Sequence, residues 1–242
     1  MDYKVIDIHS HIVPQFDDGS TSLHESWQML RLYEQQNVTD IFCTSHSGWG
    51  IEDYTEYKQD YITQFEALRD MCKRGNININ VHPGCEILTL PEDIDNMLNA
   101  VENGSLVKLG NSNCLLVELF PYVEFDEAEL IIKKVLAKGY QPIIAHMERN
   151  INLTESMVDK LVKMGALIQI NAFSFVDEKD ERIKSKARNL LQDKNVHFIG
   201  SDAHRITHRP PNLTSGVEYV LANCDKDYAT AILCENAKKM LI

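Results

Sequence analysis

Short apolar runs recur along the chain, and amphipathic stretches separate most of them. Each run is of strand length and rich in Val, Ile, Leu or Phe, which is typical of a β-strand. The seven runs cover residues 5–8, 40–44, 77–81, 114–117, 142–145, 166–170 and 197–200. This repeated alternation of strands and helices predicts a parallel α/β architecture, either an open sheet or a barrel.

The stretches between the runs carry apolar residues at helical spacing. The first begins at Ser22-Leu-His-Glu25, which has the form of a capping box, and continues with Trp27 and Leu30. Helices are expected over residues 23–34, 57–72, 94–101, 130–137, 157–164, 183–191, 214–222 and 227–240. No low-complexity linker interrupts the alternation, so we expect one domain over residues 1–242.

Residues that can bind metals follow the predicted strands at their carboxyl ends. The first strand runs into Asp7-Ile-His9-Ser-His11, and because alternate side chains of a strand share a face, all three are expected to point the same way. Two imidazoles with an acid behind them are typical of a metal site. Asp17 and Asp18 come shortly afterwards and add carboxylate oxygens in a turn.

The other strands end in the same kind of residue. At these ends stand His46, Glu86, Glu118, His146, Asn171, Asp202 and His204. In a barrel the site gathers from the carboxyl ends of many strands, whereas an open sheet binds its ligand at one switch point. A ligand-type residue on every strand therefore favours a barrel with a metal site at this rim. We expect structural or surface roles for the remaining histidines, which are His24, His82, His197 and His208.

The number of candidate ligands exceeds what one ion can use. Five imidazoles and at least four carboxylates stand at the predicted rim, whereas a tetrahedral ion takes four ligands. Two or three divalent ions would share them, with a carboxylate bridging a pair. The mixed set suits Zn²⁺, Mn²⁺ or Fe²⁺ and also admits Mg²⁺, and the residues alone do not choose among these metals.

Composition adds mainly exclusions. The net charge of -12 argues against a nucleic-acid-binding surface, which needs a basic footprint. The first residues lack the apolar core of a signal peptide and no apolar run reaches membrane-spanning length, so we expect a cytoplasmic protein without direct membrane insertion. The six cysteines are scattered without a Cys-x-x-Cys pair, which indicates buried free thiols.

Short segments that carry this chemistry occur along nearly the whole chain. They are Asp7-Ile-His-Ser-His11, Asp17-Asp-Gly19, Thr44-Ser-His46, Gly84-x-Glu86, Ala145-His-x-Glu-Arg149, and Ser201-Asp-x-His204 with Arg209-Pro-Pro211. Together they resemble the PHP (polymerase and histidinol phosphatase) family, and are similar to its bacterial manganese-dependent protein-tyrosine phosphatases of capsule and exopolysaccharide loci. The resemblance implies a distorted seven-stranded (β/α) TIM-like barrel with a trinuclear metal centre at its C-terminal rim.

The resemblance also implies which residues hold each ion, with Mn²⁺ as the first expectation. One ion would be held by His9, His11, Glu86 and Asp202. A second would be held by Glu86, Glu118 and His146, and a third by Asp18, His46 and His204. Of the two adjacent acids, Asp18 fits the family pattern better, and Asp17 stays as an alternative.

Two arginines near the rim are candidates for binding a phosphoryl group. Arg149 follows His146 by three residues and Arg209 follows His204 by five, and a guanidinium fork matches two phosphoryl oxygens. We expect both arginines to bind substrate and to act in catalysis. We expect Arg205 to be an ordinary surface residue.

The function that the resemblance implies is hydrolysis of phosphotyrosine by direct attack of metal-bound hydroxide. The expected partner is a phosphotyrosine-bearing protein, the tyrosine-rich tail of a bacterial tyrosine kinase that controls capsular or exopolysaccharide synthesis. Two alternatives remain open: a small-molecule phosphoesterase such as histidinol phosphatase, and a non-catalytic metal-binding module.

Residue spacing excludes a cysteine-nucleophile phosphatase. The Cys-x5-Arg loop of such an enzyme requires arginine six places after a cysteine. In this chain those places are occupied by Trp49, Asn78, Pro91, Phe120, Thr230 and Met240. The predicted chemistry therefore uses water and forms no covalent phosphoenzyme.

Overall fold

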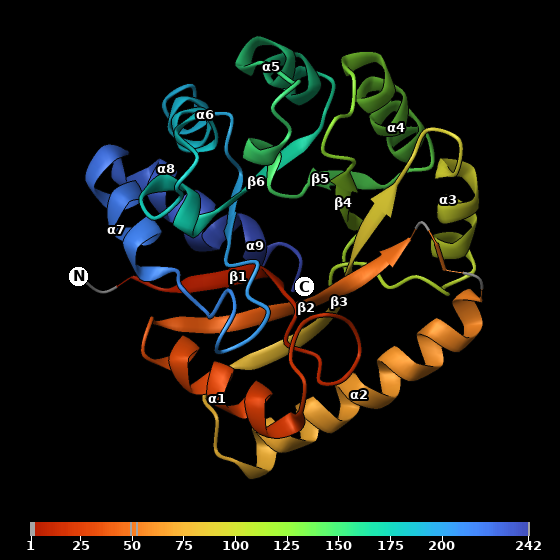
Figure 1. The fold of residues 1–242 in the computed structure, drawn as a ribbon, viewed down its shortest axis with the longest axis vertical. Helices are drawn as coiled ribbons and strands as arrows, with labels where there is room; N and C mark the ends of the chain where they lie inside the picture. Colours follow the sequence, from red (N-terminus) through yellow and green to blue (C-terminus); the bar gives the residue numbers. More distant parts are fainter. Residues whose placement is uncertain (1–2, 49, 52, 242) are drawn as a thin grey trace.

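Within the described part of the chain, seven parallel strands form the centre of the molecule and follow one another in space as they do in sequence (Figure 1). The computed structural model describes residues 3–48, 50–51 and 53–241. The strands are β1 (Val5–Ser10), β2 (Val38–Gly48), β3 (Asn80–Thr89), β4 (Cys114–Leu119), β5 (Gln141–Ile144), β6 (Leu167–Asn171) and β7 (Phe198–Gly200). The alternation read from the apolar runs is therefore present.

The sheet closes on itself where β7 meets β1. The N–H of Asp202, just past β7, donates to the carbonyl of His9 at 2.8 Å, and the N–H of His11 donates to the carbonyl of Ala203 at 2.8 Å. A parallel bridge between Ser10 and Ala203 lies at the same place. The predicted distorted seven-stranded barrel is confirmed, and residues beyond the last strand complete it.

Helices surround the strands (Figure 1). They are α1 (Leu23–Glu34), α2 (Tyr54–Arg74), α3 (Ile94–Glu102), α4 (Phe125–Ala137), α5 (Glu155–Lys163), α6 (Glu181–Gln192), α7 (Thr214–Asn223), α8 (Lys226–Thr230) and α9 (Asn236–Lys238), with the short turns η1 (Met147–Arg149), η2 (Ala172–Phe175) and η3 (Ala231–Glu235). The last predicted helix, residues 227–240, is divided, because η3 inserts a π-helical turn between α8 and α9. None of the described helices combines the length and the apolar character needed to cross a bilayer.

Apolar side chains fill two regions of the molecule. The larger region lies between the strands and the surrounding helices. The smaller one joins side chains of five strands, which can meet only inside the barrel, and these are Ile8, Phe42, Leu116, Ile143 and Phe198. Met240, near the end of the chain, packs into the same cluster at one end of the barrel. The other end of the interior is left to polar side chains.

The third strand begins later than predicted. The alternation of Ile77 and Ile79 with asparagines is typical of a strand, but pairing with β2 starts only at Asn80, opposite Asp40. The strand also ends later than predicted, since β3 continues to Thr89.

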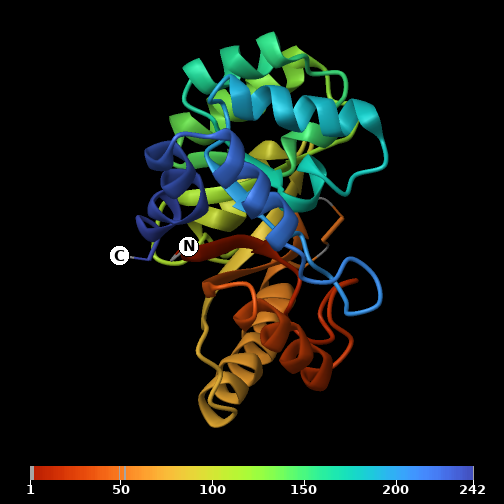
Figure 2. The ribbon, with the colours of Figure 1, turned by 90° about the vertical axis from the view of Figure 1, so that its left-hand side faces the viewer.

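Loops that follow β1 and β7 project together from one side of the barrel, while the ends of the described chain lie on the other side (Figure 2).

Asp7 joins the seam between β1 and β7. Its carboxylate accepts from the backbone N–H of Ser201 at 2.9 Å, from the Ser201 hydroxyl at 2.6 Å and from the N–H of His9 at 3.1 Å. Tyr33 of α1 bonds to Ser10 and Ser201 in the same network. We expected Asp7 to point the same way as His9 and His11, but its carboxylate bonds to Ser201 instead. Strand pairing is irregular between Asp7 and Ser10, so the simple alternation of side chains along the strand does not hold there.

Replacing Asp7 with alanine is expected to lower the free energy of unfolding by about 3 kcal/mol, because the buried N–H groups of Ser201 and His9 lose their acceptor. Urea unfolding followed by circular dichroism measures this loss. Asp225→Ala, which removes an exposed cap from α8, serves as the control and should cost about 1 kcal/mol. Equal losses in the two variants would contradict the role given to the seam.

Candidate metal centre

Residues from the first and last strands meet inside the carboxyl-end rim. His9 and His11 are fully buried, and their Nε2 atoms lie 3.2 Å apart. Asp202 brings its Oδ1 to 3.6 Å from Nε2 of His9 and 3.5 Å from Nε2 of His11. Closure of the barrel therefore brings these three predicted ligands together.

Glu86 of β3 lies in the middle of the imidazoles. Its Oε1 is 2.8 Å from Nε2 of His146 and 3.3 Å from Nε2 of His9, and its Oε2 is 3.1 Å from Nδ1 of His46 and 3.3 Å from Nε2 of His11. Burial opposes ionisation of Glu86, but the four imidazoles lower its pKa well below the ordinary value. Among the described residues its buried Oε2 has no hydrogen-bond partner. This is the arrangement expected of a carboxylate that bridges cations.

Glu118 of β4 is the second carboxylate on this side. Its Oε1 lies 3.6 Å from Nε2 of His146, and its Oε2 lies 3.9 Å from Nδ1 of His46. Burial and the nearby charge of Glu86 raise the pKa of Glu118. Two carboxylates thus share one small space, which disfavours ionisation of both unless positive charge lies between them.

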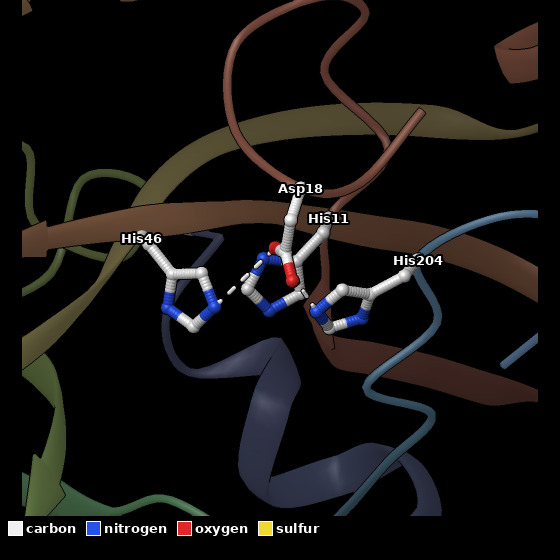
Figure 3. Close-up of side chains that lie close together, drawn as sticks. All are labelled: His11, Asp18, His46 and His204. Carbon is white, nitrogen blue, oxygen red and sulfur yellow. Dashed lines mark ion pairs between the residues drawn. The ribbon is translucent and has the colours of Figure 1, made fainter. Parts of the chain in front are cut away.

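Asp18 points between His46 and His204, with His11 close by (Figure 3). Its Oδ1 lies 3.5 Å from Nε2 of His46 and 3.4 Å from Nε2 of His204. The rings of His11 and His204 stack with their centroids 3.9 Å apart. Burial, followed by the neighbouring His11, lowers the pKa of His204 to about 4, so this imidazole is neutral at pH 7 and can donate a lone pair.

Asp17 supports His11 from behind. Its Oδ2 accepts from Nδ1 of His11 at 2.8 Å and from the N–H of His46 at 3.0 Å, while its Oδ1 accepts from the N–H of Gly19 at 2.9 Å. Because Nδ1 of His11 donates to a carboxylate, a lone pair is left on its Nε2. Of the two adjacent acids, it is Asp18 that lies among the candidate ligands.

The described residues contain four groups whose donor atoms lie within 4.8 Å of one another. These groups are His11, Asp18, His46 and His204; His9, His11 and Asp202; His9, Glu86 and His146; and His46, Glu86 and Glu118. Every predicted metal ligand belongs to at least one group. The grouping differs from the expected one in that His11 joins Asp18, and His46 joins Glu86 and Glu118. The assignment of residues to individual ions stays a prediction.

This donor set fits divalent cations. Four carboxylates and the two guanidinium groups of Arg149 and Arg209 leave an excess of negative charge in a largely buried space, and unpaired buried charge is costly. The two Nε2 atoms of His9 and His11 face each other at 3.2 Å, and a cation or a proton is needed between them. Imidazole and carboxylate ligands together suit Mn²⁺, Zn²⁺ or Fe²⁺.

Both candidate phosphate-binding arginines lie at one edge of the centre. Nη2 of Arg149 is 2.7 Å and Nη1 of Arg209 is 2.9 Å from Oδ2 of Asp202. Arg209 also donates from Nη2 to Nε2 of His204 at 2.8 Å. The two side chains are 30% and 31% exposed, so they reach the surface of the rim.

Three residues of the candidate site have a left-handed backbone. The φ angles are 29° at His146, 52° at Asp202 and 53° at Arg209. A non-glycine residue in this region costs on the order of 1–3 kcal/mol and is held there by its surroundings. Here the N–H of Asp202 bonds to His9 and the carbonyl of Arg209 accepts from the N–H of His204. These turns direct side chains at the ends of β5 and β7 toward the centre.

Two expectations about the rim require correction. Arg205, expected to be an ordinary surface residue, donates from Nε to the carbonyls of Asp18 and Gly19 at 2.9 and 3.0 Å and so holds that loop. Strand β6 carries no histidine or carboxylate; it carries the buried amides of Gln169 and Asn171, and Asn171 bonds to Asp202 of the candidate centre. The sequence signal for these two buried amides was the presence of two polar residues at alternate positions of an otherwise apolar strand.

The histidines set aside on sequence grounds lie outside the ligand groups. Nε2 of His82 bonds to Asp40 at 2.8 Å, and Nδ1 of His197 accepts from the N–H of Ile168 at 3.2 Å. Both are structural residues, as predicted.

A cavity of about 580 Å³ opens beside the centre. His46 and Glu118 line it on the side of the ligand groups, and Phe16, Tyr57 and Leu88 supply apolar surface. The rings of Phe16 and Tyr57 meet edge to face at 5.0 Å. The cavity therefore adjoins β2 to β4, and neither Arg149 nor Arg209 is among the residues that line it.

Binding of Mn²⁺ to metal-depleted protein is expected to release at least about one proton per protein molecule. Burial opposes protonation of His9 and His11, but nearby carboxylates raise the pKa of both, so at neutral pH a cation must displace protons. Isothermal titration calorimetry in two buffers with different ionisation enthalpies measures the number released. His82→Gln should leave that number unchanged, and equal enthalpies in both buffers would rule out the expected displacement.

Comparison with known proteins gives one consistent family. The family model described as capsular polysaccharide synthesis, CpsB/CapC, matches residues 5–242. The chain is 29% identical over 245 residues to tyrosine-protein phosphatase CpsB of Streptococcus agalactiae, covering 98% of both chains. It is 31% identical over 246 residues to tyrosine-protein phosphatase YwqE of Bacillus subtilis, covering 98% of this chain and 91% of that one.

The solved structures agree with this result. A structure from work on YwqE of Bacillus subtilis and CpsB of Streptococcus pneumoniae, described as unique metal-dependent tyrosine phosphatases, superposes with a TM-score of 0.85 and 27% identity, and the match covers 98% of this chain and 94% of that chain. On these matches the chain belongs to the CpsB/CapC family of capsular polysaccharide synthesis.

Proposed function

We propose that this protein is a metal-dependent protein-tyrosine phosphatase in which water attacks the phosphorus of phosphotyrosine directly. The observation that carries the proposal is the gathering of five imidazoles and four carboxylates at one end of the barrel, with two arginines at the edge of the cluster. Relatives that match nearly the whole chain are tyrosine-protein phosphatases, which supports the same activity here.

We infer that two or three divalent ions, Mn²⁺ first among them, are held by the four ligand groups, with Glu86 as the shared ligand. When bound, such ions supply positive charge for phosphoryl oxygens and a source of hydroxide near neutral pH. Glu86, Glu118 and Asp202 orient the imidazoles around them. Asp17 keeps His11 in the tautomer whose Nε2 faces the centre.

Arg149 and Arg209 are proposed to bind the phosphoryl group. Both guanidinium groups approach the same carboxylate oxygen of Asp202, so the two groups lie close together at one region of the rim. Guanidinium forks match the spacing of phosphoryl oxygens and stay charged at any relevant pH. A phosphate held there would lie over the centre with its ester oxygen free to point away from β7.

The apolar cavity beside His46 and Glu118 is proposed to receive the phenyl ring of the substrate. It lies beside the centre and neither arginine lines it, and the leaving group would lie there when the phosphoryl group is held at Asp202. Phe16 and Leu88 offer apolar contacts to a ring. Because a phenol leaves with a pKa of about 10, aryl phosphates need less protonation of the leaving group than alkyl phosphates do.

The cysteines are unsuited to act as nucleophiles. Cys43 and Cys85 are buried in the core, and burial raises the pKa of both thiols, the latter to about 11. Burial likewise raises the pKa of the other four cysteines. No thiolate is therefore favoured near neutral pH, which supports attack by water.

The physiological substrate is proposed to be the tyrosine-rich tail of a bacterial tyrosine kinase, met in the cytoplasm. The family's role in capsular polysaccharide synthesis supports this choice. An extended tail can place its phosphotyrosine at an open rim, and the cavity beside the centre is open to solvent on one side.

The substrate proposal is tested by comparing kcat/KM across three phosphate esters. The kcat/KM for phosphotyrosyl peptides is expected to exceed that for phosphoseryl peptides and for histidinol phosphate by at least about tenfold, which corresponds to a barrier difference of about 1.4 kcal/mol.

Strong chelation should abolish hydrolysis and added Mn²⁺ should restore it, whereas alkylation of the thiols should leave hydrolysis largely intact. A preference for histidinol phosphate would instead identify a small-molecule phosphoesterase, and full activity after metal removal would contradict the mechanism.

Arg149→Ala and Arg209→Ala are each expected to reduce kcat/KM for a phosphotyrosyl peptide by roughly 30- to 150-fold, because a charge-assisted contact worth about 2–3 kcal/mol is lost. Bound Mn²⁺, measured by elemental analysis, should stay near the level of the unsubstituted protein. Arg182→Ala is the matched control, since Arg182 of α6 is exposed and pairs with Asp180, which caps that helix. Similar small effects in all three variants would return both arginines to a role in surface charge.

A further inference from the structure

Strand β6 presents two buried amides where its neighbours present metal ligands. Gln169 and Asn171 have no exposed surface and stand at alternate positions of the strand. Buried polar groups are almost always hydrogen-bonded, so their partners indicate their role. Those partners are His9 of β1, His146 after β5 and Asp202 after β7.

The hydrogen bonds of Gln169 have only one consistent direction. The backbone N–H of His146, which can only donate, lies 2.8 Å from Oε1 of Gln169. This oxygen is therefore the acceptor for Nδ1 of His9 as well, at 3.1 Å, and Nδ1 must carry the proton. A neutral imidazole has one N–H, so a lone pair is left on Nε2 of His9, the atom that faces Glu86 and Asp202.

The directions of the Asn171 hydrogen bonds follow from those of Gln169. With Oε1 of Gln169 assigned as an acceptor, its Nε2 donates to Oδ1 of Asn171 at 2.8 Å. Nδ2 of Asn171 is then a donor, and it bonds to Oδ2 of Asp202 at 3.0 Å. Arg149 and Arg209 approach this same oxygen, which leaves Oδ1 of Asp202 to face the imidazoles.

Only a side-chain amide can occupy position 169 in this network. A carboxylate accepts from His9 and His146 but offers no donor to Asn171, and an amine offers no acceptor. Space is reserved for the amide as well: a Cβ atom at Gly200 of β7 would lie 2.9 Å from Nε2 of Gln169 and 2.8 Å from Cβ of His9. His11, by contrast, is backed by the carboxylate of Asp17.

We propose that Gln169 and Asn171 are positioning residues that orient His9, His146 and Asp202 for cation binding. The proposal rests on the proposed phosphatase function only in taking this centre as the metal site. Second partners of this kind fix the tautomer of a ligating histidine, and their loss typically weakens metal binding by about 10- to 100-fold.

The tautomer of His9 is the direct test. Ring ¹⁵N-labelled, metal-depleted full chain is examined by long-range ¹H–¹⁵N NMR at alkaline pH, and His9→Gln identifies the signals of His9. The unsubstituted protein is expected to show the Nδ1–H form. A predominant Nε2–H form would overturn the proposal without any further variant.

Two substitutions at position 169 separate hydrogen bonding from packing. Gln169→Met keeps the length of the side chain but removes its hydrogen bonds to His9, His146 and Asn171, so the preference of His9 for the Nδ1–H form should be lost. Gln169→Glu keeps the acceptor and should restore that form. Gln141→Met is the matched control, because Gln141 donates to the carbonyl of Gly165 at the far end of β5.

Metal affinity gives the second readout, with free Mn²⁺ followed by electron paramagnetic resonance. Gln169→Met and Asn171→Leu should each bind Mn²⁺ about 10- to 100-fold more weakly, and Gln141→Met within about twofold of the unsubstituted chain. Folded Gln169→Met with unchanged Mn²⁺ affinity and an unchanged His9 tautomer would refute the assignment. If the two variants lose Mn²⁺ affinity but the unsubstituted chain hydrolyses no phosphotyrosyl peptide, the proposed function is refuted and the positioning role of Gln169 and Asn171 stands.

Discussion

The hydrogen bonds that join the ends of β1 and β7 are the interaction on which the rest of the structure depends. His9, His11 and Asp202 make these bonds with their backbones and send their side chains into the candidate metal centre. Asp7 and Ser201 strengthen the same seam directly below. Closing the barrel also assembles this part of the candidate metal centre, because the residues that close the sheet with their backbones face the centre with their side chains.

Charge is the second constraint, and it explains the composition of the rim. Carboxylates and imidazoles crowd into a largely buried space, with Glu86 in contact range of four imidazoles. Such a cluster is unfavourable without cations, so the residues around it are arranged to hold each lone pair inward. Asp17 does this for His11 with a full charge, while Gln169 does it for His9 without one. The neutral partner avoids adding another negative charge to the same space.

The strands, their parallel order and the ligand-type residues at their ends could be predicted from the sequence, because apolar runs and strand periodicity are local signals. Asp7 could not be placed, because an irregular register in β1 breaks the alternation. The choice between Asp17 and Asp18 depends on the path of a loop that Arg205 holds from the other end of the chain. The amides of β6 were visible as polar residues, but their partners come from three other strands. Contacts of that range leave no trace in a local pattern.

The long separation between the two halves of the seam has a consequence for synthesis of the protein. Asp7 and Ser201 are 194 residues apart, so a ribosome releases β1 long before its partner strand exists. During that interval His9 and His11 do not have Asp202 beside them, and for most of it His9 also lacks Gln169 of β6 behind it. The candidate metal centre can therefore be complete only after translation has passed β7, because Asp202 and His204 follow that strand.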